Sequence, residues 1–159
     1  MSPDVLPLVL AAPLLVLVAA GDFHAMRIPN WLVLAMVTLF ALASLAVLDL
    51  PQIGWRFATA GIVLVVGFVT FLAGAFAGGD VKALTALALF VPTDQQSLAL
   101  FGLTLSASLL IGIVSMTLLR STLGHPGSPH ASLATARGYP MGISIALAGL
   151  LFPAIHAWF

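Results

Sequence analysis

The chain has 159 residues, of which 62% are hydrophobic and 6% are charged. A soluble domain of this size could not cover so much apolar surface with polar groups, so the composition indicates an all-α protein that crosses a membrane several times. The formal net charge is zero, which gives no support to a nucleic-acid partner. The absence of cysteine excludes disulfides, thiolate metal sites and a cysteine nucleophile.

The first apolar run lacks the basic segment that precedes a signal peptide's core, because Asp4 is acidic and no Lys or Arg comes before the run. We therefore expect a retained first span and about six transmembrane helices in a single domain covering residues 1–159. The polar connections that we expect include a loop at Asp49–Arg56 and a long segment at Arg120–Gly138. The expected spans are about Val5–Gly21, Trp31–Leu48, Phe57–Phe76, Val81–Val91, Ser97–Leu119 and Tyr139–Phe159.

Basic residues predict the orientation of these spans in the bilayer. With six spans both termini lie on one side, and Lys and Arg mark the cytoplasmic side. Arg56 is the one basic residue in the connections on the side of the termini, which we therefore place outside. Asp22 and Asp80 then share the cytoplasmic side. The connections on that side hold Arg27, Lys82, Arg120 and Arg137.

The stretch Ala77–Lys82 (Ala-Gly-Gly-Asp-Val-Lys) puts an acid between two apolar runs. An ionised carboxylate in hydrocarbon is costly, so such a residue indicates a functional site. The run that follows, about Val81–Val91, rises only about 16 Å as a helix. Because a hydrocarbon core is about 30 Å thick, we expect Asp80 to lie inside the membrane, unless the helices tilt or the bilayer is locally thin.

Asp22 and Asp80 can form a pair of catalytic carboxyl groups. Peptide hydrolysis by two aspartates needs one ionised group to activate water and one protonated group to polarise the carbonyl, and two carboxyls held close together share a proton. One alternative is a set of separate interfacial charges, with Asp22 paired to Arg27 and Asp80 paired to Lys82. Another is an ion pathway that uses the two acids.

The histidines do not indicate a metal site. His24 is near Asp22 in the sequence, but one His with two Asp lacks the paired spacing of metal-binding motifs. We expect no metal and no cofactor, and we expect His125 and His130 to be solvated.

Three segments carry a family resemblance. Gly78-Gly79-Asp80-Val81-Lys82 resembles the GxGD motif of the type IV prepilin leader peptidases, which are membrane aspartyl proteases. Asp22 followed by Arg27-Ile28-Pro29-Asn30 resembles the first catalytic segment of that family, and Tyr139–Ala146 resembles its last-span segment. The sequence departs from the motif at Ala77, where the family has a glycine; alanine would be strained if that position needed a positive φ.

The resemblance implies that the whole chain is one transmembrane peptidase domain with Asp22 and Asp80 as its catalytic acids. It implies a prepilin or pseudopilin substrate, cut at the cytoplasmic face of the bacterial inner membrane between a short basic leader and an apolar helix. The small size and the missing cysteine-bearing segment resemble the branch that serves tight-adherence (Flp) pili and imply that the product is not methylated. Candidates for motif or substrate-contact roles are Gly78, Gly79, Lys82, Arg27, Pro29 and Asn30.

The residues alone leave other functions open. Lys82 and Arg27 are as well explained as anchors at the membrane surface. A small proton- or ion-coupled transporter could use Asp22 and Asp80 as carriers, although no segment after Asp94 repeats the Arg27–Asn30 stretch as an inverted repeat would. A non-catalytic membrane assembly subunit is a further alternative. Nothing in the sequence indicates an oligomeric state.

Overall fold

The computed structural model describes residues 3–125, 127–134 and 138–158, and this part of the chain is helical without any strand. Four helices are long and apolar enough to cross a membrane, and a fifth apolar helix is shorter, which confirms the class predicted from composition. The elements are η1 (Pro3–Val5), α1 (Leu6–Leu10), α2 (Ala12–Ala25), α3 (Asn30–Val47), α4 (Leu50–Leu72), α5 (Gly78–Ala88), α6 (Gln95–Leu123), α7 (Ala131–Ala134) and α8 (Met141–Trp158).

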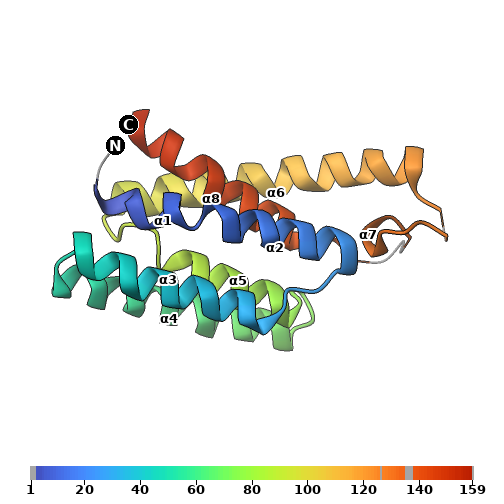
Figure 1. Ribbon diagram of the computed structural model, residues 1–159. Helices are drawn as coiled ribbons and strands as arrows, with labels where there is room; N and C mark the ends of the chain where they lie inside the picture. The colour runs from blue at the N-terminus through green and yellow to red at the C-terminus, as the bar shows by residue number, and fades with distance from the viewer. Residues whose placement is uncertain (1–2, 126, 135–137, 159) are drawn as a thin grey trace.

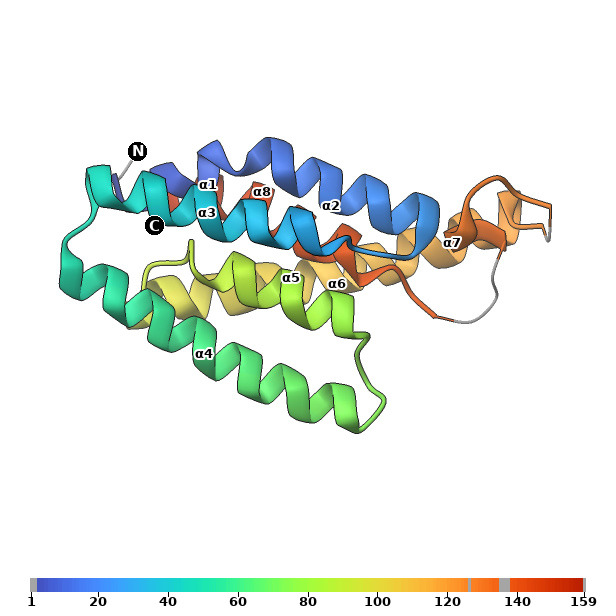
Figure 2. The same ribbon diagram turned by 60° about the horizontal axis from the view of Figure 1, so that its bottom comes forward.

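The long helices run back and forth along one axis, so that both termini lie at one end of the bundle and α7 lies at the other (Figure 1). Helix α8 is the centre of the packing, because it contacts α1, α2, α5 and α6. Helix α5 packs against α3, α4 and α8, while α4 lies at the outer edge of the bundle (Figure 2).

The first crossing consists of α1 and α2 with a break at Ala11. Pro13 lies in the first turn of α2, where a helix needs no N–H donor, so the proline sets the start of the second piece. Helix α2 continues to Ala25, beyond the predicted end at Gly21. Asp22 therefore lies in the last turn of a helix and not in a connection.

Helix α4 starts earlier than predicted. Asp49 and Gln52 form a reciprocal capping box, so the helix begins at Leu50 and the expected Asp49–Arg56 loop was wrong. Arg56 is 2% exposed inside this helix. Its guanidinium donates hydrogen bonds to the carbonyl oxygens of Phe90 at 3.0 Å and Asp4 at 2.9 Å.

Helix α5 has 11 residues and begins with the two glycines of the motif, which lie in its first turn. Ala77 is the N-cap with φ −79° and ψ 148°, an extended conformation that any residue adopts, so alanine at this motif position is unstrained. Most of the helix is buried among its neighbours.

The expected polar segment Arg120–Gly138 is partly helical. Helix α6 continues through Arg120 to Leu123, and α7 lies further along the segment. Arg137, one of the basic residues used to predict orientation, lies outside the described residues. Helix α8 begins at Met141, two residues after the predicted start at Tyr139.

Candidate active site

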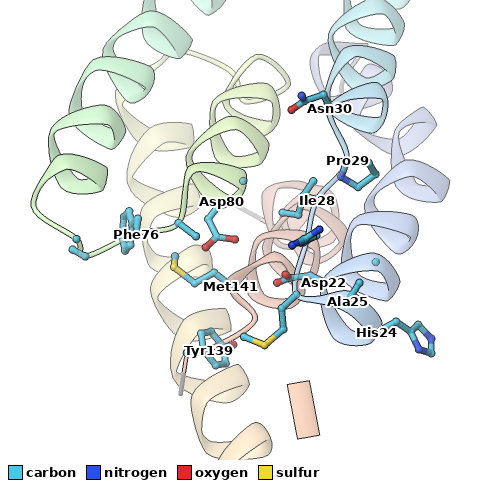
Figure 3. Close-up of a pocket in the computed structure, with 18 residues that line it drawn as sticks. Asp22, His24, Ala25, Ile28, Pro29, Asn30, Phe76, Asp80, Tyr139 and Met141 are labelled. Atoms are coloured by element: carbon cyan, nitrogen blue, oxygen red, sulfur yellow. The ribbon is translucent and has the colours of Figure 1, made fainter. Parts of the chain in front are cut away.

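A pocket of about 960 Å³ opens where α2 ends and α5 begins (Figure 3), and the α2–α3 connection lies at the end of the bundle away from the termini (Figure 1). Its walls come from the end of α2 and the residues after it, the turn at 74–77, the first turn of α5, and the segment that leads into α8. Among the residues singled out in the sequence, the lining includes Asp22, Asp80, Arg27, Pro29, Asn30 and Gly79.

Two other predicted residues lie beside the pocket. Lys82 is exposed and donates from Nζ to Asn30 Oδ1 at 3.1 Å, which links α5 to the start of α3. A Cβ on Gly78 would lie 3.6 Å from the Phe71 ring, so this glycine packs against α4. A Cβ on Gly79 would contact Ile28 at an ordinary 3.7 Å, so alanine would fit there.

The carboxyl groups of Asp22 and Asp80 enter the pocket from different helices. Asp22 is 4% exposed and Asp80 is 8% exposed. Both side chains point into the same space (Figure 3), close enough for the two groups to interact electrostatically. Within the described chain Lys82 bonds to Asn30, so the alternative pairing of Asp80 with Lys82 is not what the fold forms.

Helix α8 holds the Asp22 carboxylate in place. The backbone N–H of Gly142, in the first turn of α8, donates to Asp22 Oδ2 at 2.7 Å. The partial positive charge of a helix N-terminus favours an anion at this position. A Cβ on Gly142 would lie 2.9 Å from both Cβ and Oδ2 of Asp22, so only glycine allows this approach.

Asp22 lies at the C-terminal end of α2 and Asp80 at the N-terminal end of α5, and both ends border the pocket. Met26 ends α2 in a left-handed conformation with φ 49°, and its N–H donates to the Asp22 carbonyl at 2.9 Å. Asp80 is the third residue of α5, and its carboxyl interacts with the backbone N–H of the N-cap, Ala77. An acidic side chain at this position commonly binds the N-cap N–H.

The segment before α8 contributes pocket residues to which the sequence alone assigned no role, namely Gly138, Tyr139 and Met141. The Tyr139 hydroxyl is hydrogen-bonded to Ser144, which donates to the Ser108 carbonyl of α6 at 2.8 Å. Burial raises the pKa of Tyr139 above its usual value despite the Ser144 hydrogen bond, so its hydroxyl stays protonated. The one sequence feature that pointed to these pocket residues was the family resemblance of Tyr139–Ala146. That resemblance did not indicate which residue of the segment would contact Asp22.

His24 lies at the rim of the pocket with its ring turned away from the two aspartates (Figure 3). Its Nδ1 atom is 2.9 Å from Nδ1 of His130, and the His130 ring also packs against Phe23 with centroids 4.9 Å apart. His130 is half-buried and keeps partial contact with solvent, while His125 is exposed. The pair fastens the segment around α7 to the end of α2.

Residues 9–125 match the type IV leader peptidase family. The match includes both aspartates and every helix from α2 to α6, and it stops before α8, so the resemblance noted at Tyr139–Ala146 lies outside it. No curated protein matches the chain, and no solved structure matches it. Because the matched residues make up well over half of its length, the chain belongs to the type IV leader peptidase family.

Proposed function

We propose that this protein is an intramembrane aspartyl endopeptidase that removes the leader of a prepilin or pseudopilin, with Asp22 and Asp80 as its catalytic acids. The observation that carries the proposal is that two buried carboxyl groups from different helices meet in one open pocket at the end of a membrane bundle. Membership of a leader peptidase family supports the reaction class.

The chemistry requires the two acids to hold different protonation states. The ionised carboxylate takes a proton from water as the water oxygen attacks the scissile carbonyl carbon, and the protonated partner donates its proton to the carbonyl oxygen. When the resulting diol collapses, the C–N bond breaks, the carboxyl that took the proton from water gives it to the leaving amine, and the other carboxylate takes a proton from a diol hydroxyl, which restores both starting states. A pocket of about 960 Å³ has room for several residues of an extended peptide.

The charges at the pocket end support a cytoplasmic active site in the bacterial inner membrane. Arg27 lines the pocket, Lys82 lies beside it, and Arg120 lies beside α7 at the same end. Arg56, the basic residue assigned to the opposite side, is buried inside α4 and contributes no exposed charge. Positive residues near span ends favour the cytoplasm, so the pocket end faces inward.

The small branch that serves tight-adherence (Flp) pili is the proposed subgroup, and we propose that the chain does not methylate its product. The mature pilin N-terminus, measured by mass spectrometry after co-expression with this protein as the sole candidate enzyme, should carry a free amine. A methyl group on that amine would contradict this part of the proposal.

The test of the catalytic assignment is processing of a co-expressed prepilin, followed as a gel shift. Asp22→Asn and Asp80→Asn should each abolish cleavage, because asparagine neither takes up nor releases the proton that the reaction needs. The double variant should be no worse than either single variant, because the two acids act as a unit. Protein level and membrane insertion should stay near those of the unmodified protein.

Asp49→Asn and Asp94→Asn are the matched controls, because both acids are helix N-caps outside the pocket and asparagine also caps helices well. Both controls should cleave normally. Retained cleavage in either pocket variant would overturn the proposal and favour an ion-coupled transporter instead. The sequence argues against transport, because no segment after Asp94 repeats the Arg27–Asn30 stretch as an inverted repeat would.

A further inference from the structure

Arg120 hydrogen-bonds to the connection between α6 and α8 at two points. It lies in the last turn of α6, where its Nε donates to the Ser132 carbonyl at 2.8 Å and its Nη2 donates to the Gly138 carbonyl at 2.8 Å. The two acceptors lie on either side of residues 135–137, so one guanidinium holds both flanks of that stretch. A planar group with donors in fixed directions suits this geometry better than a flexible ammonium.

Only four positions separate the Gly138 carbonyl from the N–H that holds Asp22. Gly138 has φ +83°, a conformation natural to glycine, and it turns the chain into the pocket wall formed by Tyr139 and Met141. Pro140 is buried, and the next turn presents the Gly142 N–H to Asp22 Oδ2. The position of Gly138 therefore decides where the first turn of α8 meets the carboxylate.

A second attachment holds the same segment from the other side. The Tyr139 hydroxyl bonds to Ser144, and Ser144 donates to the Ser108 carbonyl in α6. A Cβ on Gly112 of α6 would collide with the Tyr139 hydroxyl and the Ser144 oxygen, so the tyrosine fits closely against α6. With the ring held there and the Gly138 carbonyl held by Arg120, the segment has little freedom to move relative to α6.

We propose that Arg120 is a positioning residue for Asp22, acting through the Gly138–Gly142 segment. Arg120 does not line the pocket, so it does not contact the peptide directly; it keeps the Gly142 N–H aimed at one oxygen of the Asp22 carboxylate. The proposal rests on the proposed function, in which Asp22 is a catalytic acid. Its chemical meaning is that the carboxylate is held in a single orientation before substrate arrives.

The experiment measures kcat and KM of the purified, lipid-reconstituted enzyme on a synthetic prepilin peptide. Arg120→Ala should lower kcat by about 10- to 100-fold, the range expected when a catalytic group is misplaced by about 1 Å. KM should change by less than about threefold, because Arg120 makes no contact with substrate. Arg120→Lys keeps the positive charge but loses the planar guanidinium with its two donors. Its kcat should lie between those of Arg120→Ala and the unmodified enzyme.

Gly142→Ala is the second variant of the experiment, because its added Cβ would clash with the side chain of Asp22 and displace the same carboxylate. It should also lower kcat with little effect on KM, and the Arg120→Ala/Gly142→Ala double variant should be no slower than Gly142→Ala alone. Non-additivity is expected when two residues act through one contact, whereas independent effects multiply. A merely structural role for Arg120 would not produce this coupling.

Ser121→Ala, at the exposed neighbouring position, is the control for altering the end of α6. Every variant should still give a cooperative thermal transition, although Gly142→Ala should melt at a lower temperature because of its clash with Asp22. If Arg120→Ala does not fold, Arg120→Gln replaces it in the cycle. Unchanged kcat in the Arg120 variant, a large KM effect, or multiplicative loss in the double variant would overturn the positioning role. Cleavage by Asp22→Asn would instead overturn the proposed function, so the two failures are distinguishable.

Discussion

Two glycines of α6, Gly112 and Gly102, differ in whether the structure leaves room for an added Cβ atom. A Cβ on Gly112 would collide with the hydroxyls of Tyr139 and Ser144, whereas a Cβ on Gly102 meets no atom within 4 Å. We predict that Gly112→Ala lowers the free energy of unfolding by about 1–3 kcal/mol, the usual cost of overpacking. Gly102→Ala, the same change in the same helix, should be neutral or stabilise by up to about 1 kcal/mol.

Thermal unfolding in detergent measures both variants. Because Tyr139 borders the pocket, Gly112→Ala should also slow prepilin cleavage. Equal stability of the two variants would mean that Tyr139 can move away from α6 without cost.

Asp94 at the start of α6 predicts a dependence of stability on pH. Burial raises its pKa, but hydrogen bonds from Ser97 and the nearby His156 outweigh that effect and lower the pKa below its usual value. Because the pKa of Asp94 is lower in the folded state, its ionised form stabilises the fold at pH values above the unfolded-state pKa of about 3.9. That stabilisation is lost as the pH falls through the folded-state pKa. Because Asp94 is exposed, the effect should stay below about 1 kcal/mol.

The measurement for Asp94 is the difference in melting temperature between the unmodified protein and Asp94→Asn, followed from pH 7 to pH 3. The difference should shrink toward zero at the acidic end, since asparagine keeps the cap without titrating. His156 also hydrogen-bonds to the Ser97 hydroxyl at 3.0 Å and is present in both proteins, so the comparison between variants isolates the contribution of Asp94. A constant difference across the range would contradict the assignment to Asp94.

At the level of elements, α5 depends on a cation in the neighbouring helix. Helix α5 ends at Ala88, and the Phe90 carbonyl beyond it accepts a hydrogen bond from the buried Arg56 of α4. We predict that Arg56→Met destabilises the fold by about 1–3 kcal/mol, because the buried Phe90 carbonyl and the part-buried Asp4 carbonyl lose their charged donor. Hydrogen exchange of the amides at 89–91 should also rise.

Arg27→Met is the matched control for Arg56→Met, since Arg27 is an exposed cation at the other end of the bundle. Its effect on stability should be within about 0.5 kcal/mol. Equal stability of the Arg56 variant and this control would show that water or another group satisfies the Phe90 carbonyl.

Hydropathy located the apolar helices but misplaced several ends, and the errors share a physical cause. Asp22, Arg56 and Arg120 each mark a position where a polar residue was read as the membrane surface although the helix continues. In each case the polar group binds a partner supplied by the fold: the Gly142 N–H, the Phe90 carbonyl, or the carbonyls of Ser132 and Gly138. These partners are distant in sequence, 120 positions for Asp22 and Gly142, so no local pattern encodes them.

The site itself was predictable in part. That Asp22 and Asp80 would share one end followed from counting spans, because alternating spans bring every second connection to the same side. The contribution of α8 and the contact between His24 and His130 depend on tertiary packing, which hydropathy does not describe.

For the whole molecule, the orientation in the bilayer can be measured directly, since the chain has no cysteine to give background labelling. We predict that a cysteine at Leu50, exposed near the end that holds the termini, reacts with an impermeant thiol reagent in intact cells. A cysteine at Ser128, at the pocket end, should react only after the membrane is permeabilised. The reverse pattern would place the pocket outside the cell.

The shortness of α5 also bears on how the chain enters the membrane during synthesis. An 11-residue segment that contains Asp80 and Lys82 is a poor candidate for insertion alone, because it is too short to cross a hydrocarbon core about 30 Å thick and carries two charged residues. Its 23-residue neighbour α4 packs along it, so the two helices are expected to enter together as a hairpin. Helix α5 gains α8 as a neighbour only when that helix has been made. A nascent chain that has not yet reached α8 therefore has both acids but lacks the Gly142 N–H that binds Asp22, and proteolytic activity should arise only after α8 has been made.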